Sequence, residues 1–382
     1  MLAIDFGARS IKAVQLSRTG KGFRIDNFGI VLTPPDSIMH GEIKDSDLVT
    51  QALEKMLRKK GIREKKGIIA ITGQKVIVRE ITTPIMNEKE LIEGLQWEAP
   101  KYVPYDLKES LLDAKKIEEL EEKEGSQMMK VLLVAAPKSI VDQQITVLKN
   151  VRIQPKVVDI VSNAQMRAFD SYLLPAPSNE EDGTKMDVII SMGASTTEIT
   201  LIEGDRLKFT RTILKGGDDI NRLLVKELEI TFDEAERLKR RVGLTPVKLQ
   251  ENKDNEQEAS PEHEHEEKNM KNTEEEDEIP NKEQVTKLIR IGVNDIFNEI
   301  RKSLNYYKTQ YQKVAYQRII LTGGMAAMSN IGQALKQQFG ITIVMANPLK
   351  GIDINQGDVN IDNLERYKRS LATAIGLAKR ER

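Results

Sequence analysis

Short apolar runs separated by glycines open the chain. Apolar side chains cluster or alternate over residues 2–6, 11–16 and 25–32, and Gly7 and Gly20 fall in the gaps between these runs. Runs of this length with glycine between them predict three strands joined as a meander. The N-terminal region is therefore expected to form a sheet of neighbouring hairpins.

Helical periodicity first appears after this sheet. Val49 and Leu53 recur on one face of residues 46–60, which predicts an amphipathic helix capped by Asp45 or Ser46. Later strands are expected over residues 68–72, 76–83, 130–136, 187–191, 198–203, 206–213, 317–322 and 341–345, and near 156–160. Later helices are expected over residues 139–149, 218–229, 232–241, 284–311, 328–338 and 365–379, and after a capping box at Asn87 and Glu90. This interleaving predicts an α/β architecture with mixed sheets.

Composition narrows the class of protein. The 382 residues suffice for two lobes with separate cores, and 58 basic against 59 acidic side chains argue against a dedicated nucleic-acid binder. The chain has no cysteine, which excludes disulfides, thiolate metal sites and thiol catalysis. Met1 leads directly into an apolar strand, and no apolar run is long enough to span a bilayer, so we expect a cytosolic protein.

Two polar segments interrupt the pattern. Residues 175–187 are expected to be an exposed connection between lobes, because they hold two prolines and a glycine among polar side chains. Residues 250–283 are rich in Glu, Lys and Asn and hold no aromatic side chain, so we expect disorder there. His263 and His265 lie in this segment without a third ligand at fixed spacing, and a solvated charge run explains them better than a metal site.

The first glycine turn carries the first candidate chemistry. The chain lacks the P-loop motif and the dinucleotide motif, since the turn at Gly7 joins strand to strand. Successive amides in such a turn can bind phosphate, with help from the Ser10 hydroxyl and the Lys12 cation. Asp5 would face the phosphates, which is useful only if a divalent metal lies between. Taken alone, the motif fits a buried hairpin without a ligand equally well.

The second half of the chain repeats this strand, turn and strand. The repeated turn comprises Gly193, Ala194, Ser195, Thr196 and Thr197. Alignment of Gly7 with Gly193 pairs Ser10 with Thr196. Two matching hairpins, one in each lobe, predict an internal duplication in which phosphates are gripped from both sides.

Further glycine pairs complete the candidate site. Gly216 and Gly217 precede a predicted helix, whose N-terminus can face a nucleotide. A buried strand leads into the turn at Gly323, Gly324 and Met325. Glu236 and Lys239 stand three residues apart on one helix face, where they could contact a sugar or base or form an ordinary surface ion pair.

In this order, the motifs resemble the actin and Hsp70 superfamily, and in particular the PilM family of type IV pilus assembly proteins. The segments that carry the resemblance are residues 4–12, 79–84, 90–91, 97–99, 101–104, 134–137, 157–159, 192–197, 215–218, 234–239, 321–325 and 374–378. They extend over most of the chain.

The resemblance implies an actin-like two-lobed fold with a small inserted SHS2-type α+β subdomain. The expected parts are residues 1–76 and 155–175 for the first large subdomain, 77–154 for the insertion, 185–215 and 315–382 for the second large subdomain, and 216–314 for a helical subdomain that contains the acidic segment 250–283.

The resemblance also implies ATP and Mg²⁺ in the cleft. Asp5, Gly7, Ser10 and Lys12 match the first phosphate motif, residues 193–197 match the second, and Glu236, Lys239, Gly323, Gly324 and Met325 match the nucleoside pocket. Asp5 would position the metal or water indirectly. The implied partner is a PilN-like bitopic membrane protein, bound through its cytoplasmic N-terminal peptide, with other pilus platform proteins. The protein would be cytoplasmic and peripheral to the inner membrane through these partners.

One departure bears on activity. Ser191 stands where the family usually has an aspartate that helps hold metal and attacking water, so we expect weak or absent ATP hydrolysis. One alternative is an FtsA-like filament protein. Another is a small-molecule kinase of the same fold, with Asp159 as a base near the lobe hinge.

Overall fold

The computed structural model describes residues 1–20, 22–120, 127–173, 184–244, 281–310, 314–354 and 360–380. Most of the expected connection at 175–187 and of the acidic segment at 250–283 lies outside these residues. Residues 184–187 belong to a strand and residues 282–283 to a helix. Within the described ranges, no helix is both long and apolar enough to cross a bilayer.

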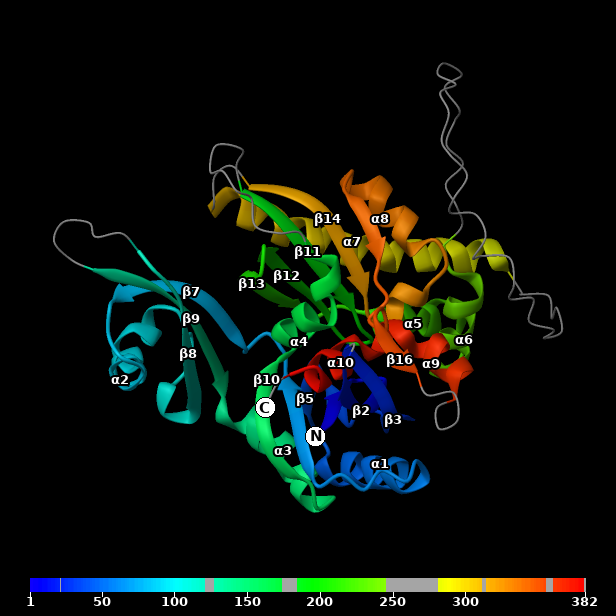
Figure 1. Cartoon of the computed structure of the whole chain (residues 1–382). Coiled ribbons are helices and arrows are strands. Elements are labelled where there is room, and N and C mark those ends of the chain that lie inside the picture. Colours follow the sequence, from blue (N-terminus) through cyan, green and yellow to red (C-terminus); the bar gives the residue numbers. More distant parts are fainter. Residues whose placement is uncertain are drawn as a thin grey trace.

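Two central sheets share one strand pattern (Figure 1). The first has the order β10-β6-β1-β2-β3-β16 and the second the order β13-β12-β11-β14-β15. In each sheet, three antiparallel strands form a meander. The first strand of the meander pairs in parallel with a fourth strand, which pairs in parallel with a fifth. The first sheet comprises β1 (Leu2–Phe6), β2 (Ser10–Thr19), β3 (Gly22–Leu32), β6 (Lys66–Ile71), β10 (Gln154–Ile160) and β16 (Ile352–Ile354). The second comprises β11 (Thr184–Met192), β12 (Thr197–Glu203), β13 (Arg206–Ile213), β14 (Val314–Thr322) and β15 (Thr342–Met345).

The outer face of the first sheet is covered by α1 (Ser46–Lys59) and α3 (Lys138–Asn150). Asp45 caps α1, as expected, by accepting bonds from the amides of Asp47 and Leu48. Apolar side chains of α3 join the same core as those of α1. The expected insertion at 77–154 is therefore too long at its C-terminal end, because α3 packs on the first lobe. A short hairpin of β4 (Ile38–Met39) and β5 (Glu42–Ile43) precedes α1.

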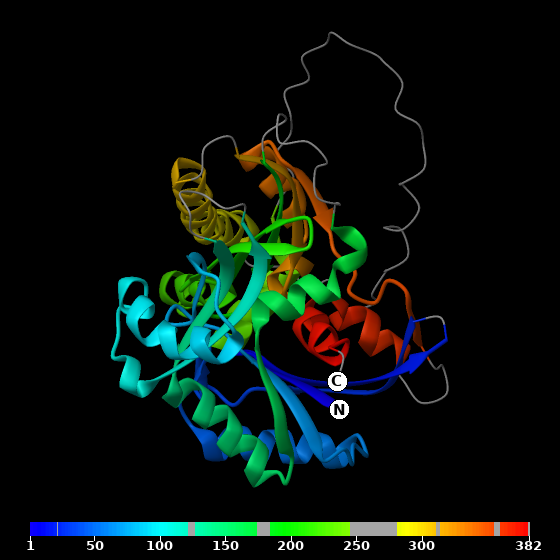
Figure 2. The same ribbon diagram turned by 60° about the vertical axis from the view of Figure 1, so that its left-hand side comes forward.

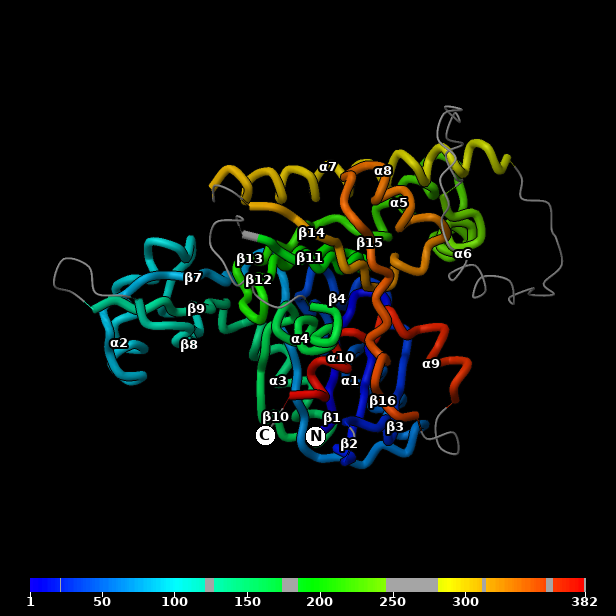
Figure 3. The backbone as a smooth tube through the Cα atoms, turned by 45° about the horizontal axis from the view of Figure 1, so that its top comes forward, coloured from blue at the N-terminus to red at the C-terminus, as the bar shows by residue number. Residues whose placement is uncertain are grey.

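The inserted part is a three-stranded sheet with one helix on it (Figure 3). Its strands are β7 (Ile77–Pro84), β8 (Ser110–Glu119) and β9 (Met128–Pro137), in the order β7-β9-β8. Asn87 and Glu90 form the expected capping box at the start of α2 (Glu88–Glu98). Short 3-10 turns follow at Ala99–Lys101 and Leu107–Glu109.

Helices of the second lobe lie on the far side of its sheet. They are α5 (Gly217–Leu228), α6 (Phe232–Val242), α7 (Lys282–Gln310) and α8 (Ile331–Phe339). The apolar stripe of α7 packs into the largest core cluster of the molecule, and Thr231 and Glu234 form the expected capping box of α6.

Two short helices lie between the sheets (Figure 2). Apolar side chains of α4 (Val161–Ala168) and α10 (Ala372–Ala378) join one cluster with β1 and β6 and another with β11, β12 and β14. They approach so closely that a Cβ on Gly376 would lie 1.7 Å from the carbonyl oxygen of Ala164. This pair of helices therefore sets how the two sheets face each other.

The C-terminal segment differs from the expectation. In place of one helix over 365–379, the chain forms α9 (Ile361–Tyr367), a 3-10 turn (Lys368–Leu371) and α10. The reason is that the carbonyl of Arg369 leaves the helical pattern and accepts bonds from the Gly323 amide and the Thr322 hydroxyl. The strand β16, which the sequence analysis assigned to the second lobe, pairs with β3 of the first sheet.

Candidate functional site

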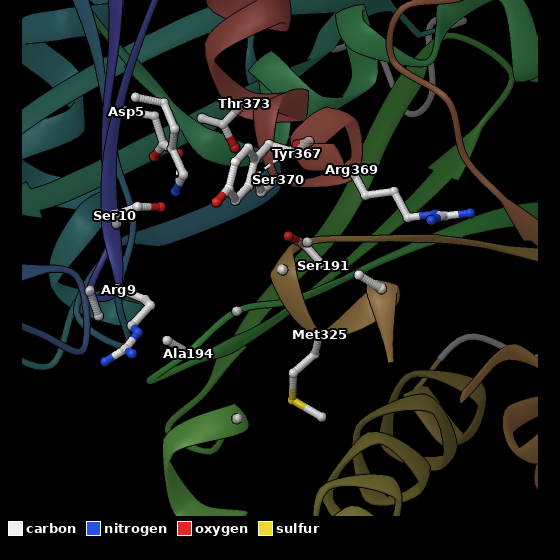
Figure 4. A pocket seen from close by; sticks show the side chains of 18 of the residues that line it. Asp5, Arg9, Ser10, Ser191, Ala194, Met325, Tyr367, Arg369, Ser370 and Thr373 are labelled. Atoms are coloured by element: carbon white, nitrogen blue, oxygen red, sulfur yellow. Dashed lines mark hydrogen bonds and ion pairs between the residues drawn. The ribbon is translucent and has the colours of Figure 1, made fainter. Parts of the chain in front are cut away.

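A cleft with a volume of about 900 Å³ lies between the two lobes. Residues of both sheets and of the C-terminal segment line it (Figure 4). The predicted site residues that line the cleft are Asp5, Gly7, Ser10, Lys12, Gly193, Ala194, Ser195, Thr196, Gly217, Glu236, Lys239, Gly323, Gly324 and Met325. The fold thus brings together positions that are more than 300 residues apart in the sequence.

The two glycine turns have the same hydrogen bond. The Gly7 amide donates to the Ser10 carbonyl at 3.2 Å, and the Gly193 amide donates to the Thr196 carbonyl at 2.8 Å. A Cβ on Gly7 would lie 2.8 Å from the Ser10 oxygen, and one on Gly193 would lie 3.0 Å from the Thr196 oxygen. A side chain at Gly7 would force its surroundings to shift, and one at Gly193 would be in tight contact, so both turns favour glycine.

An ion pair closes the base of the first hairpin. Asp5 and Lys12 are register partners on β1 and β2, and the Lys12 Nζ atom lies 3.0 Å from the Asp5 Oδ2 atom. Both side chains are mostly buried and line the cleft. The Lys12 cation expected to face phosphate is thus already partly neutralised by Asp5.

The second hairpin has a different base. Ser191 takes the place of Asp5, and its register partner is Glu198. Glu198 is 6% exposed, and its Oε2 atom accepts a bond of 2.5 Å from the Thr72 hydroxyl of the first lobe. Its Oε1 atom has no hydrogen-bond partner among the described residues. Burial raises the pKa of the Glu198 carboxyl to about 7, with a further rise from the charge of Asp5 and a partial offset from the Thr72 bond.

Sequence reasoning did not single out Glu198. The sequence does hold a signal for Glu198, because the alignment of Gly7 with Gly193 makes Glu198 equivalent to Lys12. Glu198 lies in the buried part of β12, and its burial depends on the packing of the other lobe.

Two of the predicted residues do not line the cleft. The Thr197 side chain is fully buried, and its hydroxyl donates to the Lys215 carbonyl at 2.9 Å. A Cβ on Gly216 would lie 2.3 Å from the Ala194 carbonyl oxygen. Both residues hold the α5 loop against the second turn.

The start of α5 differs from the expectation that its amides face a nucleotide. The Gly217 amide donates to the Gly193 carbonyl at 3.0 Å, and the Asp218 amide donates to the Ala194 carbonyl at 2.8 Å. These amides therefore fix the second turn in place. Ser195 is also held, since its hydroxyl accepts a bond from the His40 amide of the first lobe.

Glu236 and Lys239 form a buried ion pair in the cleft wall. Their charged atoms lie 2.6 Å apart, and the Lys239 ammonium also donates to the Gly217 carbonyl. Burial opposes ionisation of Glu236, but the Lys239 charge and the bonds from Lys239, Asn221 and Arg240 together lower the pKa of Glu236 to about 2. The interpretation as an ordinary surface pair is therefore wrong.

The C-terminal segment supplies a wall that the sequence did not indicate. Tyr367, Arg369, Ser370 and Thr373 line the cleft between the two hairpins (Figure 4). Their position depends on the 3-10 turn that replaces the expected helix. By contrast, Asp159 is buried in ion pairs with Arg167 and Arg380 and does not line the cleft, which removes the observation behind the kinase alternative.

Comparison with known proteins gives the following relatives. The sequence model of the type IV pilus assembly protein PilM matches residues 3–252, and that of the cell division protein FtsA matches residues 188–376. The solved PilM–PilN type IV pilus biogenesis complex aligns with 99% of this chain and 97% of its own at a TM-score of 0.78 and 21% identity. The ethanolamine utilization protein EutJ from Carboxydothermus hydrogenoformans aligns with 99% of this chain and 88% of its own at a TM-score of 0.51 and 11% identity.

A curated sequence relative is the cell shape-determining protein MreB of Pasteurella multocida. It is 23% identical over an alignment of 230 positions that covers 52% of this chain and 62% of that protein. The chain thus spans less than two thirds of this relative. The predicted actin-like, two-lobed α/β fold is confirmed by the structural similarity to the PilM–PilN complex and by the duplicated sheets. Since the first family's model covers well over half of the sequence, the chain belongs to the PilM family of type IV pilus assembly proteins.

Proposed function

We propose that this protein is an ATP-binding scaffold of the type IV pilus assembly platform. The observation that carries the proposal is the pair of glycine turns with one hydrogen-bond geometry, which face a single cleft from opposite lobes. A cleft of about 900 Å³ falls within the usual range for small-molecule and cofactor sites. Backbone turns of this kind favour anionic groups, and both turns would bind phosphates of one nucleotide.

The residues present fit ATP with Mg²⁺. Mg²⁺ is usually held by nucleotide phosphates, waters and one or two carboxylates. Asp5 and Glu198 offer such carboxylates from opposite lobes, and the Glu198 Oε1 atom has no other partner. When bound, the cation would neutralise phosphate charge. The described residues hold no cluster of three or more histidine or carboxylate ligands, so a cation here would depend on the nucleotide.

Different cleft residues would bind different parts of the nucleotide. The turns at Gly7 and Gly193 would hold the phosphates, with the Ser10 and Thr196 hydroxyls beside them. The buried pair of Glu236 and Lys239 would contact the sugar or base. The Glu236 carboxylate stays ionised beside Lys239, so it could accept a bond from the sugar in addition to those from Lys239 and Arg240.

The partner we propose is the cytoplasmic N-terminal peptide of a PilN-like bitopic membrane protein. The similarity to a PilM–PilN complex supports this choice. Ion pairs tie the inserted sheet to the second lobe: Lys208 of β13 lies 3.0 Å from Glu80 of β7, and Arg206 of β13 bonds to Glu118 of β8. Movement of the second lobe on nucleotide binding would therefore shift the inserted sheet and change its affinity for the peptide. Turnover would be slow or absent, since Ser191 replaces the aspartate that would help hold the attacking water.

Calorimetry with Mg-ATP tests the nucleotide part. We expect the wild type to bind ATP and Gly217→Val to lose binding, because a Cβ there would lie 2.9 Å from the Lys239 ammonium and 3.1 Å from the Met325 side chain. Gly20→Val is the matched control, since a Cβ on Gly20 meets no atom within 4 Å. Absence of ATP binding by the folded wild type would overturn the proposal. A pull-down with the peptide, with and without ATP, tests the partner.

A further inference from the structure

Glu198 carries an unfilled bonding capacity at the floor of the cleft. One carboxylate oxygen is held by the Thr72 hydroxyl, while the Oε1 atom is buried and has no partner in the part of the chain that the structure describes. Burying a carboxyl group with an unmet hydrogen-bonding capacity is unfavourable for folding. A buried carboxyl oxygen without a bonding partner at the floor of a cleft indicates a site where a ligand supplies that partner.

The two duplicated hairpins differ in the charged side chains at their bases. In the first hairpin, the carboxyl of Asp5 is neutralised across the strand pair by Lys12. In the second, Glu198 occupies the position of Lys12, and its cross-strand neighbour is the uncharged Ser191. Residues directly opposite on antiparallel strands project to the same face, so the Glu198 carboxyl faces the same side of the sheet as Ser191.

The charges around Glu198 point to a cation. Asp5, Ser191 and Thr72 surround this end of the cleft, and the Asp5 charge is close enough to disfavour ionisation of Glu198. The Lys12 ammonium, which also lines the cleft, is paired with Asp5. Two carboxyl groups from opposite lobes therefore line one cleft, and only that of Asp5 has an ion-pair partner among the described residues.

We propose that Glu198 supplies the carboxylate that Ser191 lacks. Together with Asp5, Glu198 holds the divalent cation that accompanies the nucleoside triphosphate, either directly or through a bound water. This inference rests on the proposed nucleotide site. It assigns a metal-binding role to a residue on the returning strand of the second hairpin, one strand away from the position where a carboxylate is expected.

The test measures ATP affinity by calorimetry with Mg²⁺ and with EDTA. In the wild type, Mg²⁺ tightens ATP binding. In Glu198→Gln, we expect the Mg²⁺-dependent gain to fall by about 10- to 100-fold, the usual effect of removing a group that supports a metal. ATP affinity without Mg²⁺ is expected to stay equal or to rise, because a negative charge near the phosphates is removed. Glu203→Gln, at the end of the same strand, is the matched control and should behave as the wild type.

Two further variants separate a metal site from a mere contact between lobes. Thr72→Val removes the hydroxyl that links the lobes but leaves the carboxyl, so most of the Mg²⁺ gain should remain. If Thr72→Val loses the gain as fully as Glu198→Gln, the contact alone matters and the inference is wrong. Ser191→Asp combined with Glu198→Gln should recover the gain, since it restores a carboxylate one strand away.

Failure of the inference and failure of the proposed function are distinguishable. A wild type that binds no ATP in either condition overturns the proposed function. A wild type that binds Mg-ATP, with an unchanged Mg²⁺ gain in folded Glu198→Gln, overturns only the role of Glu198.

Discussion

The two hairpins that face the cleft share a backbone and differ in charge. Both turns place a glycine where a Cβ would crowd the backbone, and both close with the same amide-to-carbonyl bond. The first has a paired aspartate and lysine at its base, whereas the second has a serine and a buried glutamate with one free oxygen. The glycines thus set the backbone of each turn, while the charged side chains at the base of the hairpin differ between the two lobes. The first hairpin is complete without a ligand, and the second is not.

The largest expected effect comes from separating the two hairpins. Gly376→Ala places a methyl group into the Ala164 carbonyl, so α4 and α10 must move apart, and with them the sheets that they hold. Overpacking of this severity should lower the free energy of unfolding by about 3 kcal/mol. Urea denaturation measures it, with Gly20→Ala as the control in open space. An unchanged midpoint would contradict the close packing of these helices.

The next effect isolates the charge of the second hairpin. The pKa of Glu198 is raised from 4.5 to about 7 in the folded protein, so the folded state binds more protons than the unfolded state between these values. The stability contributed by the protonated carboxyl is present below pH 4.5 and is lost as pH rises through 7. Glu198→Gln should therefore unfold at a higher urea concentration than the wild type at pH 8. We expect its free energy of unfolding to be higher by on the order of 2 kcal/mol.

The same comparison at pH 5 provides the control. There the two proteins should have similar stability, because Glu198 is protonated in the folded wild type. A difference that does not change between pH 5 and pH 8 would show that the buried carboxyl is not the cause. A variant that gains stability while losing its response to Mg²⁺ would be typical of a functional group kept at the expense of the fold.

The smallest effect compares the turns directly. Gly7→Ala meets the Lys12 ammonium at 2.6 Å and the Ser10 carbonyl oxygen at 2.8 Å, whereas Gly193→Ala meets the Thr196 carbonyl oxygen at 3.0 Å. We expect Gly7→Ala to weaken ATP binding by about tenfold, equivalent to about 1.4 kcal/mol, and Gly193→Ala to weaken it less. Calorimetry of both variants measures the difference. Equal losses would show that the two turns tolerate a methyl group alike.

Much of this fold could be predicted because its signals are local. Periodicity placed most helices and strands, and capping residues marked the starts of α1, α2 and α6. The paired glycine turns, read together, indicated the duplication that the sheet order displays.

The features that sequence reasoning missed depend on distant contacts. The three-residue β16 is too short for a periodic signal, and the break between α9 and α10 depends on bonds from Thr322 and Gly323 to the Arg369 carbonyl. The burial of Glu198 depends on Thr72, which lies 126 residues away in the sequence. Local patterns of hydrophobicity carry no information about such pairings.

The central claim is that both glycine turns hold one triphosphate. A crystal structure with Mg²⁺ and a non-hydrolysable ATP analogue tests it most directly. We expect phosphate oxygens in contact with the Gly7 turn and with the Gly193 turn in the same molecule. An empty cleft at saturating analogue, or phosphates that touch only one of the two turns, would contradict it.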